Sequence, residues 1–358
     1  MNVLSLFDGI SCGRVALEKA GIMVDKYYSS EIDKYAIQVA DKNYPCDTKN
    51  RLGDVTKINT NNLPKIDLLI GGSPCQGFSF AGKQLNFEDI RSKLFFEYVN
   101  ILNHIKKFNP NVKFLLENVS MKKEYRDVIS NYLGVSPVVI NSALVSAQNR
   151  KRLYWCNWKI GQPEDRGILL KDILENQEEK IGAVRGRYLV DGKRADTKIG
   201  STKGLTVQRL EIRKDSKSNC LTTVQKDNNV IINVKNFAHI FKKNYLQYDI
   251  NGKGNGSQDQ RAYYKENKHG TLSSSSGGSK CKVLLSNEKE NIYIRKLTPI
   301  ECERLQTVPD NYTECDGVSK TQRYKMLGNG WTVDVIAHIF KNIKPSEVEQ
   351  EKQLDLFQ

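Results

Sequence analysis

The chain has 358 residues, of which 39% are apolar, which is enough for a buried core and, by length, for about two domains. Its apolar runs fall well short of the ~20 residues that a membrane helix needs, and its first residues lack the basic start of a signal peptide. Eight cysteines without a Cys-x-x-Cys pair argue against a disulfide framework or a zinc site. We therefore expect a cytoplasmic protein with no metal and no membrane partner.

The net charge of +14 is concentrated in one segment. Residues 180–295 hold 23 Lys and Arg against 10 Asp and Glu, whereas the rest of the chain is nearly balanced at 32 against 31. A polyanion such as nucleic acid would attract this segment. The alternative is a lysine-rich solvated surface of the kind that a low-GC genome produces.

The first part of the chain predicts a nucleotide-like pocket. Residues 3–7 form a predicted strand, and a glycine loop and a helix follow. The loop lacks the Gly-x-Gly-x-x-Gly spacing that places a pyrophosphate on a helix N-terminus, which disfavours a nicotinamide cofactor, and its Asp8 suits a positive centre such as a sulfonium. The next predicted strand ends in Glu31, placed to bind ribose hydroxyls, and Asp54 follows where it could bind an adenine amino group. Each acid alone is more typical of a solvated loop, but three such loops in succession favour an adenosyl pocket.

A candidate nucleophile follows the predicted buried strand 66–70. The sequence there is Gly71-Gly72-Ser73-Pro74-Cys75-Gln76-Gly77-Phe78-Ser79. The glycines let the backbone turn tightly, and Pro74 fixes φ just before the cysteine. The C-terminal edge of a parallel sheet is where α/β folds place their chemistry. A free cysteine is more often a small buried hydrophobe, so the residues around Cys75 decide between the two interpretations.

Two further groups could assist such a nucleophile. The predicted strand 112–116 leads into Glu117, a carboxylate beside an apolar sheet that could hold or donate a proton. In Gln148-Asn149-Arg150-Lys151-Arg152, between predicted strands 138–140 and 153–156, the alternate arginines lie on one face of an extended segment. They are either a solvated basic loop or an arginine pair near Cys75 that favours the thiolate and holds an anion or a base oxygen.

The periodic pattern fades after residue 160. Residues 213–223 and 264–274 form a faint repeat of basic, hydroxyl-rich loops suited to phosphates and base edges. Chance similarity between low-complexity segments explains it equally well, and 273–279 could be a linker. A helix capped by Thr298 is predicted next, and a last helix to about residue 343.

In this order the motifs resemble those of the DNA cytosine-5 methyltransferases. The matching residues are Phe7-Asp8-Gly9, Glu31, Asp54, Pro74-Cys75-Gln76, Glu117-Asn118-Val119, Gln148-x-Arg150-x-Arg152, residues 295–309 and Gly328-Asn329. There are two departures from the bacterial pattern. The first loop reads Phe-Asp-Gly-Ile-Ser-Cys-Gly rather than Phe-x-Gly-x-Gly-Gly, and Trp331 stands where many bacterial members have small or aliphatic residues. Both features are more similar to the animal de novo methyltransferases.

The resemblance implies an α/β fold, a Rossmann-like sheet that uses S-adenosylmethionine, with an inserted, mostly β or irregular domain. The expected divisions are a catalytic cofactor-binding domain at 1–168, a basic target-recognition domain at 169–294, a hinge and motif at 295–326, a C-terminal helix returning to the catalytic domain at 327–344, and a polar tail at 345–358.

The resemblance also implies a reaction and its residues. Cys75 would attack C6 of a flipped-out cytosine in duplex DNA, Glu117 would neutralise N3, and Arg152, supported by Arg150, would hold the ring oxygen. The residues expected to bind the cofactor are Phe7, Asp8, Gly9, Ile10, Glu31, Ile32, Asp54, Val55, Pro74, Leu94, Asn329, Gly330 and Trp331. Those expected to contact DNA are Ser73, Gln76, Ser79, Gln148, Arg213, Lys217, Thr222, Thr223, Arg261, Lys268, Ser273 and Ser274.

The expected partner is double-stranded DNA, met by a monomer in the cytosol of a bacterium or a phage-infected host. A restriction–modification or DNA-protection role is expected, with a cognate restriction endonuclease as a functional partner. An RNA (tRNA) cytosine-5 methyltransferase would share the catalytic residues, but the long basic insertion favours duplex DNA. A catalytically silent DNA-binding relative is the other alternative. Adenine-N6 transfer would need an Asn/Asp-Pro-Pro-Tyr loop where Cys75 stands.

Overall fold

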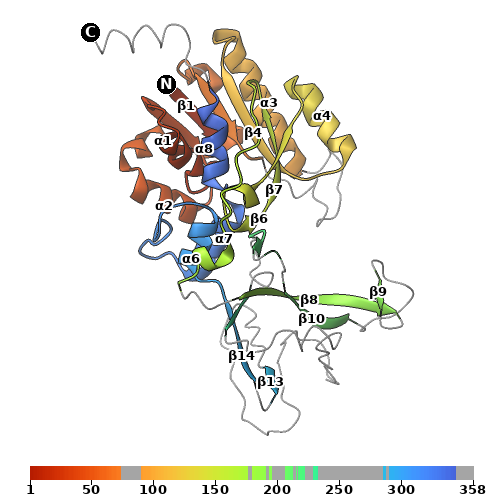
Figure 1. The fold of residues 1–358 in the computed structure, drawn as a ribbon. Coiled ribbons are helices and arrows are strands. Elements are labelled where there is room, and N and C mark those ends of the chain that lie inside the picture. Colours follow the sequence, from red (N-terminus) through yellow and green to blue (C-terminus); the bar gives the residue numbers. More distant parts are fainter. Residues whose placement is uncertain are drawn as a thin grey trace.

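The computed structural model describes residues 1–73, 90–175, 180–190, 193–195, 206–212, 215, 217–221, 229–232, 285–287 and 290–343. A six-stranded sheet in the order β2-β1-β3-β4-β7-β5 lies at the centre of its larger part (Figure 1). The strands are β1 (Asn2–Leu6), β2 (Lys26–Ser30), β3 (Leu68–Gly71), β4 (Lys113–Val119), β5 (Val138–Asn141) and β7 (Lys151–Cys156). The first four run parallel, and β7 is antiparallel to both β4 and β5. The expected α/β fold is confirmed.

Both faces of this sheet are covered by helices. Every residue of β3 is buried, and alternate side chains enter two separate apolar cores. Leu68 and Ile70 join the core that α1 and α8 complete, whereas Leu69 joins the core of α3 and α4. The helices are α1 (Cys12–Lys19), α2 (Lys34–Asn43), α3 (Ile90–Phe108), α4 (Lys123–Leu133), α6 (Pro299–Leu305), α7 (Lys320–Asn329) and α8 (Val333–Lys341). In the part of the chain that the structure describes, none of them is long and apolar enough to cross a membrane.

The predicted start of α6 is confirmed. The Thr298 hydroxyl accepts a hydrogen bond from the backbone N–H of Glu301, and the Glu301 carboxylate accepts one from the backbone N–H of Thr298. This capping box satisfies donors that a helix N-terminus otherwise leaves without partners, and Pro299 occupies the first turn. The last predicted helix is α8, which ends at Lys341.

Short elements connect the larger ones. The 3₁₀ turns are η1 (Pro45–Asn50), η2 (Val55–Lys57), η3 (Thr60–Asn62), η4 (Ser142–Leu144) and η5 (Leu170–Asp172). The short strand β6 (Gln148–Asn149) precedes β7 and pairs in parallel with β11 (Ser218–Asn219).

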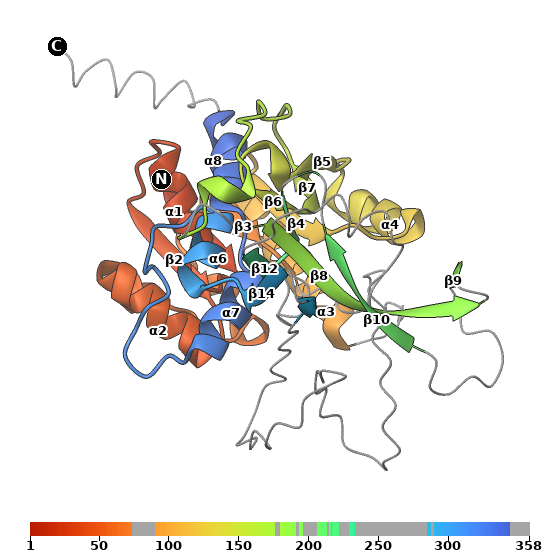
Figure 2. The ribbon, with the colours of Figure 1, turned by 60° about the horizontal axis from the view of Figure 1, so that its bottom comes forward.

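A second sheet with the path β10-β8-β12-β14-β13, and β9 alongside β8, lies apart from the central sheet (Figures 1 and 2). Its strands are β8 (Lys180–Val190), β9 (Lys193–Ala195), β10 (Thr206–Ile212), β12 (Asn229–Ile232), β13 (Leu285–Asn287) and β14 (Glu290–Lys296). These strands fall in the basic segment, where the sequence predicts an inserted β domain. The exact domain boundaries stay a prediction, and β14 runs across the expected one at 294.

Candidate active site

A cavity of about 400 Å³ lies at the carboxyl edge of the parallel strands. Because these ends meet at one edge of the sheet, the loops after β1, β2 and β3 and the end of β4 face the same space. The volume is in the range of small-molecule sites. Every described residue that the sequence assigns to the cofactor lines this cavity, namely Phe7, Asp8, Gly9, Ile10, Glu31, Ile32, Asp54, Val55, Leu94, Asn329, Gly330 and Trp331.

The loop after β1 has a strained backbone. Phe7, Gly9 and Ser11 all adopt positive φ angles, of 58°, 59° and 59°, a conformation that residues other than glycine rarely take. Glu31 holds this loop, since its Oε2 accepts a hydrogen bond from the backbone N–H of Gly9 at 2.8 Å. A strained backbone that several surrounding contacts hold in place is typical of binding sites.

Two acids of the cavity wall, Glu31 and Asp54, are positioned to bind a polar ligand. The second oxygen of Glu31 accepts from the backbone N–H groups of Ile32 and Asp33, which fixes the carboxylate at the mouth of the loop after β2. Asp54 accepts hydrogen bonds from the backbone N–H and the hydroxyl of Thr56, and these bonds lower its pKa. The Asp54 carboxylate is therefore ionised at neutral pH.

Asp8 differs from the sequence expectation. It lines the cavity, but its carboxylate accepts hydrogen bonds of 2.6 Å from both the Tyr27 and the Ser11 hydroxyls. Burial raises its pKa, and these hydrogen bonds only partly offset that effect. We therefore assign Asp8 to holding the loop, and its expected place beside a positive centre such as a sulfonium stays a prediction.

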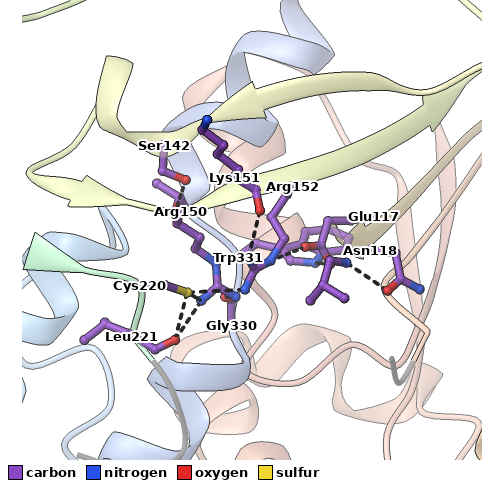
Figure 3. Close-up of polar contacts among 12 residues, drawn as sticks. Glu117, Asn118, Ser142, Arg150, Lys151, Arg152, Cys220, Leu221, Gly330 and Trp331 are labelled. Carbon is purple, nitrogen blue, oxygen red and sulfur yellow. Dashed lines mark hydrogen bonds and ion pairs between the residues drawn. The ribbon is translucent and has the colours of Figure 1, made fainter. Parts of the chain in front are cut away.

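Glu117 and Arg152 meet because of the strand register. Val119 of β4 lies opposite Arg152 of the antiparallel β7, so Glu117, two residues back on the same face, is its diagonal neighbour. Arg152 Nε lies 3.1 Å from Glu117 Oε1, and the Trp331 indole N–H donates to Glu117 Oε2 at 3.2 Å (Figure 3). Both side chains of the ion pair are largely buried, with 14% and 11% exposed. One acid and one cation thus occupy the cavity wall next to the end of β3.

Ser73, the last described residue before the nucleophile loop, is only 4% exposed. The Asn118 side-chain amide donates to its hydroxyl at 3.2 Å. Asn118 Oδ1 in turn accepts from the backbone N–H of Val119. The strand that carries Glu117 therefore also fixes the start of the loop that leads to Cys75.

Arg150 makes contacts within the fold as well as lining the cavity. It does lie on the same face as Arg152, but it is 4% exposed and its guanidinium donates to the carbonyls of Leu221, Gly328 and Gly330 at 3.0–3.3 Å (Figure 3). A guanidinium that is shared among three main-chain oxygens joins segments of the fold. We assign it a structural role, and since it also lines the cavity, its expected support of Arg152 stays a prediction.

Two residues expected to contact DNA are also engaged within the protein. Gln148 is fully buried, donates to the Leu305 carbonyl and accepts from the backbone N–H of Leu221. Lys217 Nζ donates to the carbonyls of Ala143 and Ile168, each at 2.8 Å. These contacts, together with the pairing of β6 and β11, attach residues 217–221 to the larger part of the fold. The assignment of Gln148 and Lys217 to DNA contact stays a prediction.

Cys220 is a neighbour of the site that the sequence does not single out. Its Sγ lies 3.3 Å from Arg150 Nη1 and 3.4 Å from Arg152 Nη2 (Figure 3). Burial opposes ionisation of this thiol, but the two guanidinium groups outweigh it and lower its pKa. No local pattern could have identified Cys220, because its partners are about 70 residues away in the chain.

The remaining predicted site residues lie outside the described part of the chain. They are Pro74, Cys75, Gln76, Ser79, Arg213, Thr222, Thr223, Arg261, Lys268, Ser273 and Ser274. Their roles stay predictions from the sequence.

Comparison with known proteins gives one consistent family. A model of the C-5 cytosine-specific DNA methylases matches residues 1–345. The orphan methyltransferase M.SPRI of Bacillus phage SPR is 27% identical, and the alignment covers 99% of both chains. The type II methyltransferase M.HhaI of Haemophilus parahaemolyticus is 28% identical over 97% of this chain and 95% of its own. M1.ScrFI of Lactococcus lactis subsp. cremoris is 31% identical over 94% and 76%.

Solved structures agree on the fold. The Entamoeba histolytica methyltransferase EhMeth superposes with a TM-score of 0.59 at 15% identity, covering 96% of this chain and 97% of its own. The Dnmt2 methyltransferase of S. pombe gives a TM-score of 0.54 at 18% identity, covering 95% and 97%.

Proposed function

Because the chain belongs to the family of C-5 cytosine-specific DNA methylases, we propose that it transfers a methyl group from S-adenosylmethionine to C5 of a flipped-out cytosine in duplex DNA. This proposal rests on one observation, that the residues expected to act on the base and those expected to bind the cofactor line a single cavity. Glu117, its partner Arg152 and the start of the nucleophile loop at Ser73 all line the same cavity as Glu31 and Asp54.

The cavity suits an adenosyl cofactor. Glu31 and Asp54 are fixed acceptors for hydroxyl and amino groups, and Ile10, Ile32 and Val55 supply apolar surface for a flat ring. The sequence has no dinucleotide fingerprint, and the pocket's acids would repel a pyrophosphate. When bound, S-adenosylmethionine would supply an electrophilic methyl group for the activated C5.

The residues of this chain would perform the remaining steps. The Cys75 thiolate adds to C6, and the electrons of the C5–C6 double bond make C5 an enamine carbon. Glu117, ion-paired with Arg152 in the free protein, takes up a proton from solvent and gives it to N3, so that no negative charge builds up on the ring. After methylation, a water molecule takes the C5 proton, the C6–S bond breaks to return the Cys75 thiolate, and N3 returns its proton to Glu117.

Arg152 has two roles in this proposal. Its Nε holds Glu117, while Nη1 donates to the Lys151 carbonyl and Nη2 to Cys220 Sγ; the second N–H of Nη1 or Nη2 would be the donor for the cytosine ring oxygen. The pKa of the Arg152 guanidinium is raised above its usual range, since Cys220 and Glu117 outweigh the effect of burial. Arg152 is thus a permanent cation, suited to holding an oxygen rather than to moving a proton.

The basic segment would bind the DNA. We propose residues 169–294 as the target-recognition domain, with Arg213, Thr222, Thr223, Arg261, Lys268, Ser273 and Ser274 at the duplex. A restriction–modification or phage DNA-protection role fits the relatives, which carry the names of type II and orphan phage methyltransferases. A cognate endonuclease would then be a functional partner.

The direct test is 5-methylcytosine mapping of plasmid DNA from a methylation-free host that expresses the chain, with Cys75→Ala as the matched control. We expect methylation at one short motif, lost in the variant, while binding of S-adenosylhomocysteine stays intact. Methylated DNA from the Cys75→Ala variant would overturn the covalent mechanism. Unmodified DNA, with methyl transfer to tRNA by the same purified protein, would instead assign the RNA substrate.

A further inference from the structure

Each oxygen of the Glu117 carboxylate has its own donor. Arg152 Nε lies 3.1 Å from Oε1, and the Trp331 indole N–H lies 3.2 Å from Oε2. The terminal torsion of a glutamate is broad when nothing holds it. Two donors from different elements, one on β7 and one between α7 and α8, each hold one oxygen and so restrict the carboxylate to a single orientation (Figure 3).

The surroundings leave room for the indole–carboxylate contact. A Cβ on Gly72 would stand 2.9 Å from Trp331 Nε1 and 3.1 Å from Glu117 Oε2, so any other residue there would displace one of the two groups. Gly13 of α1 also lies near the indole, but a Cβ there would meet Ile70 Cδ1 at 2.4 Å and Trp331 Cζ3 only at an ordinary contact distance of 3.5 Å. It is therefore Gly72 that leaves room for the contact between Trp331 and Glu117.

The backbone on both sides of Trp331 is fixed. The Gly330 carbonyl accepts hydrogen bonds from Arg150 Nη2 at 3.0 Å and from Gln306 Nε2 at 3.1 Å. On the other side, the Thr332 hydroxyl donates to Gln306 Oε1 at 2.9 Å. An indole on such a backbone loses little entropy when it donates a hydrogen bond, because it is already in place.

We propose that Trp331 is a positioning residue for Glu117, a role that rests on the proposed function of Glu117 as the acid for cytosine N3. Its indole N–H holds one carboxylate oxygen so that the other, at Arg152, stays directed at the base. Trp331 also lines the cofactor cavity, so a wall of that cavity sets the orientation of the acid. The proposal gives this tryptophan a task that the small or aliphatic residues of other sequences could not perform.

The first experiment compares two variants that make the same chemical change. Trp331→Phe keeps an aromatic ring and removes the N–H. Trp158→Phe does the same at an indole that donates to the Ile339 carbonyl of α8 instead of to Glu117. The measurements are the single-turnover rate of methyl transfer to plasmid DNA and the affinity for S-adenosylhomocysteine by calorimetry.

We expect Trp331→Phe to lower the single-turnover rate by about 10- to 100-fold, the size of a lost hydrogen bond to a charged group. Analogue affinity should change by less than about threefold, and Trp158→Phe should leave both quantities near wild type. In a Glu117→Gln background, Trp331→Phe should have little further effect, because the two residues would act as one unit. A Trp331→Phe rate within about threefold of wild type, or equal losses in both backgrounds, would overturn the proposal.

A second readout does not depend on activity. The chain has three tryptophans, so protein labelled with ¹⁵N-tryptophan gives three indole N–H resonances. The resonance that disappears in Trp331→Phe should move in Glu117→Gln, since the acceptor loses its charge, while the other two stay in place. An unmoved resonance would refute the contact itself. If the resonance moves but the wild-type protein methylates neither DNA nor RNA, the proposed function fails and the positioning contact stands.

Discussion

Replacing Arg150 by methionine should destabilise the fold before it affects chemistry. The substitution leaves the carbonyls of Leu221 and Gly328 without the guanidinium donor in a site where the arginine is 4% exposed, whereas the Gly330 carbonyl keeps its hydrogen bond from Gln306 Nε2. An unsatisfied buried polar group costs about 1–3 kcal/mol, so two of them amount to at least about 2 kcal/mol. At about 2–4 °C per kcal/mol, the melting temperature should fall by about 4–8 °C or more.

The assay is a thermal unfolding scan of purified Arg150→Met beside two controls. Arg150→Lys keeps the charge but lacks the planar fork, so it should recover part of the loss. Arg152→Met removes the ion pair with Glu117, and we expect it to abolish turnover at temperatures where the protein is fully folded. An Arg150→Met protein that melts within about 2 °C of wild type and loses turnover as Arg152→Met does would refute the structural assignment of Arg150.

The other predictions concern contacts around the same cavity. Lys217→Met should leave the salt dependence of DNA binding unchanged, because Lys217 Nζ is held by main-chain carbonyls. Lys268→Ala, in contrast, should reduce the slope of log affinity against log salt concentration by about one. A reduced slope in Lys217→Met would place that lysine at the DNA interface. The rate of Cys220 alkylation, monitored by peptide mass spectrometry, should rise with pH around a midpoint below the ordinary thiol pKa of ~8.5, because Arg150 and Arg152 favour the thiolate. Arg152→Met should move this midpoint upward. A midpoint that the variant does not shift would contradict the contact between Cys220 and Arg152. Asp54→Asn should weaken the binding of S-adenosylhomocysteine by about 10-fold. The ratio of the variant's dissociation constant to that of wild type should stay constant down to about pH 4, because the lowered pKa of Asp54 keeps its carboxylate ionised. A ratio that already declines above pH 5 would exclude this role of Asp54.

The carboxyl edge of the sheet could be predicted from the sequence because its signals are local. Short apolar runs mark the strands, and the glycine or the acid that follows each run marks its end. Since parallel strands bring these ends together, Glu31, Asp54 and Glu117 could be assigned to one pocket before any geometry was known. The structure places all three on the cavity wall.

Helices whose buried face lacks a regular apolar period could not be predicted from the sequence. α7 buries Arg323, Met326, Leu327 and Gly328, and its arginine is buried only because it pairs with Glu303 at 3.0 Å. A buried arginine and a buried glycine interrupt the apolar period by which a helix is recognised. α2 buries two alanines and a valine, which give a similarly weak pattern.

The role of a polar side chain was predictable only where its partner is set by the strand it occupies. Glu117 and Arg152 are neighbours through the register of β4 and β7, but the antiparallel direction of β7 has no signature in the sequence. Arg150, Gln148 and Lys217 all read as candidates for a polyanion, since basic and amide groups beside a catalytic motif are typical of DNA contacts. Their partners are main-chain groups far along the chain, at Leu221, Gly330 and Ile168.

The same set of contacts attaches residues 217–221 to the part of the fold that carries the candidate active site, where Cys220 contacts Arg152. A segment that the charge pattern assigns to target recognition therefore contacts the cation that holds the acid.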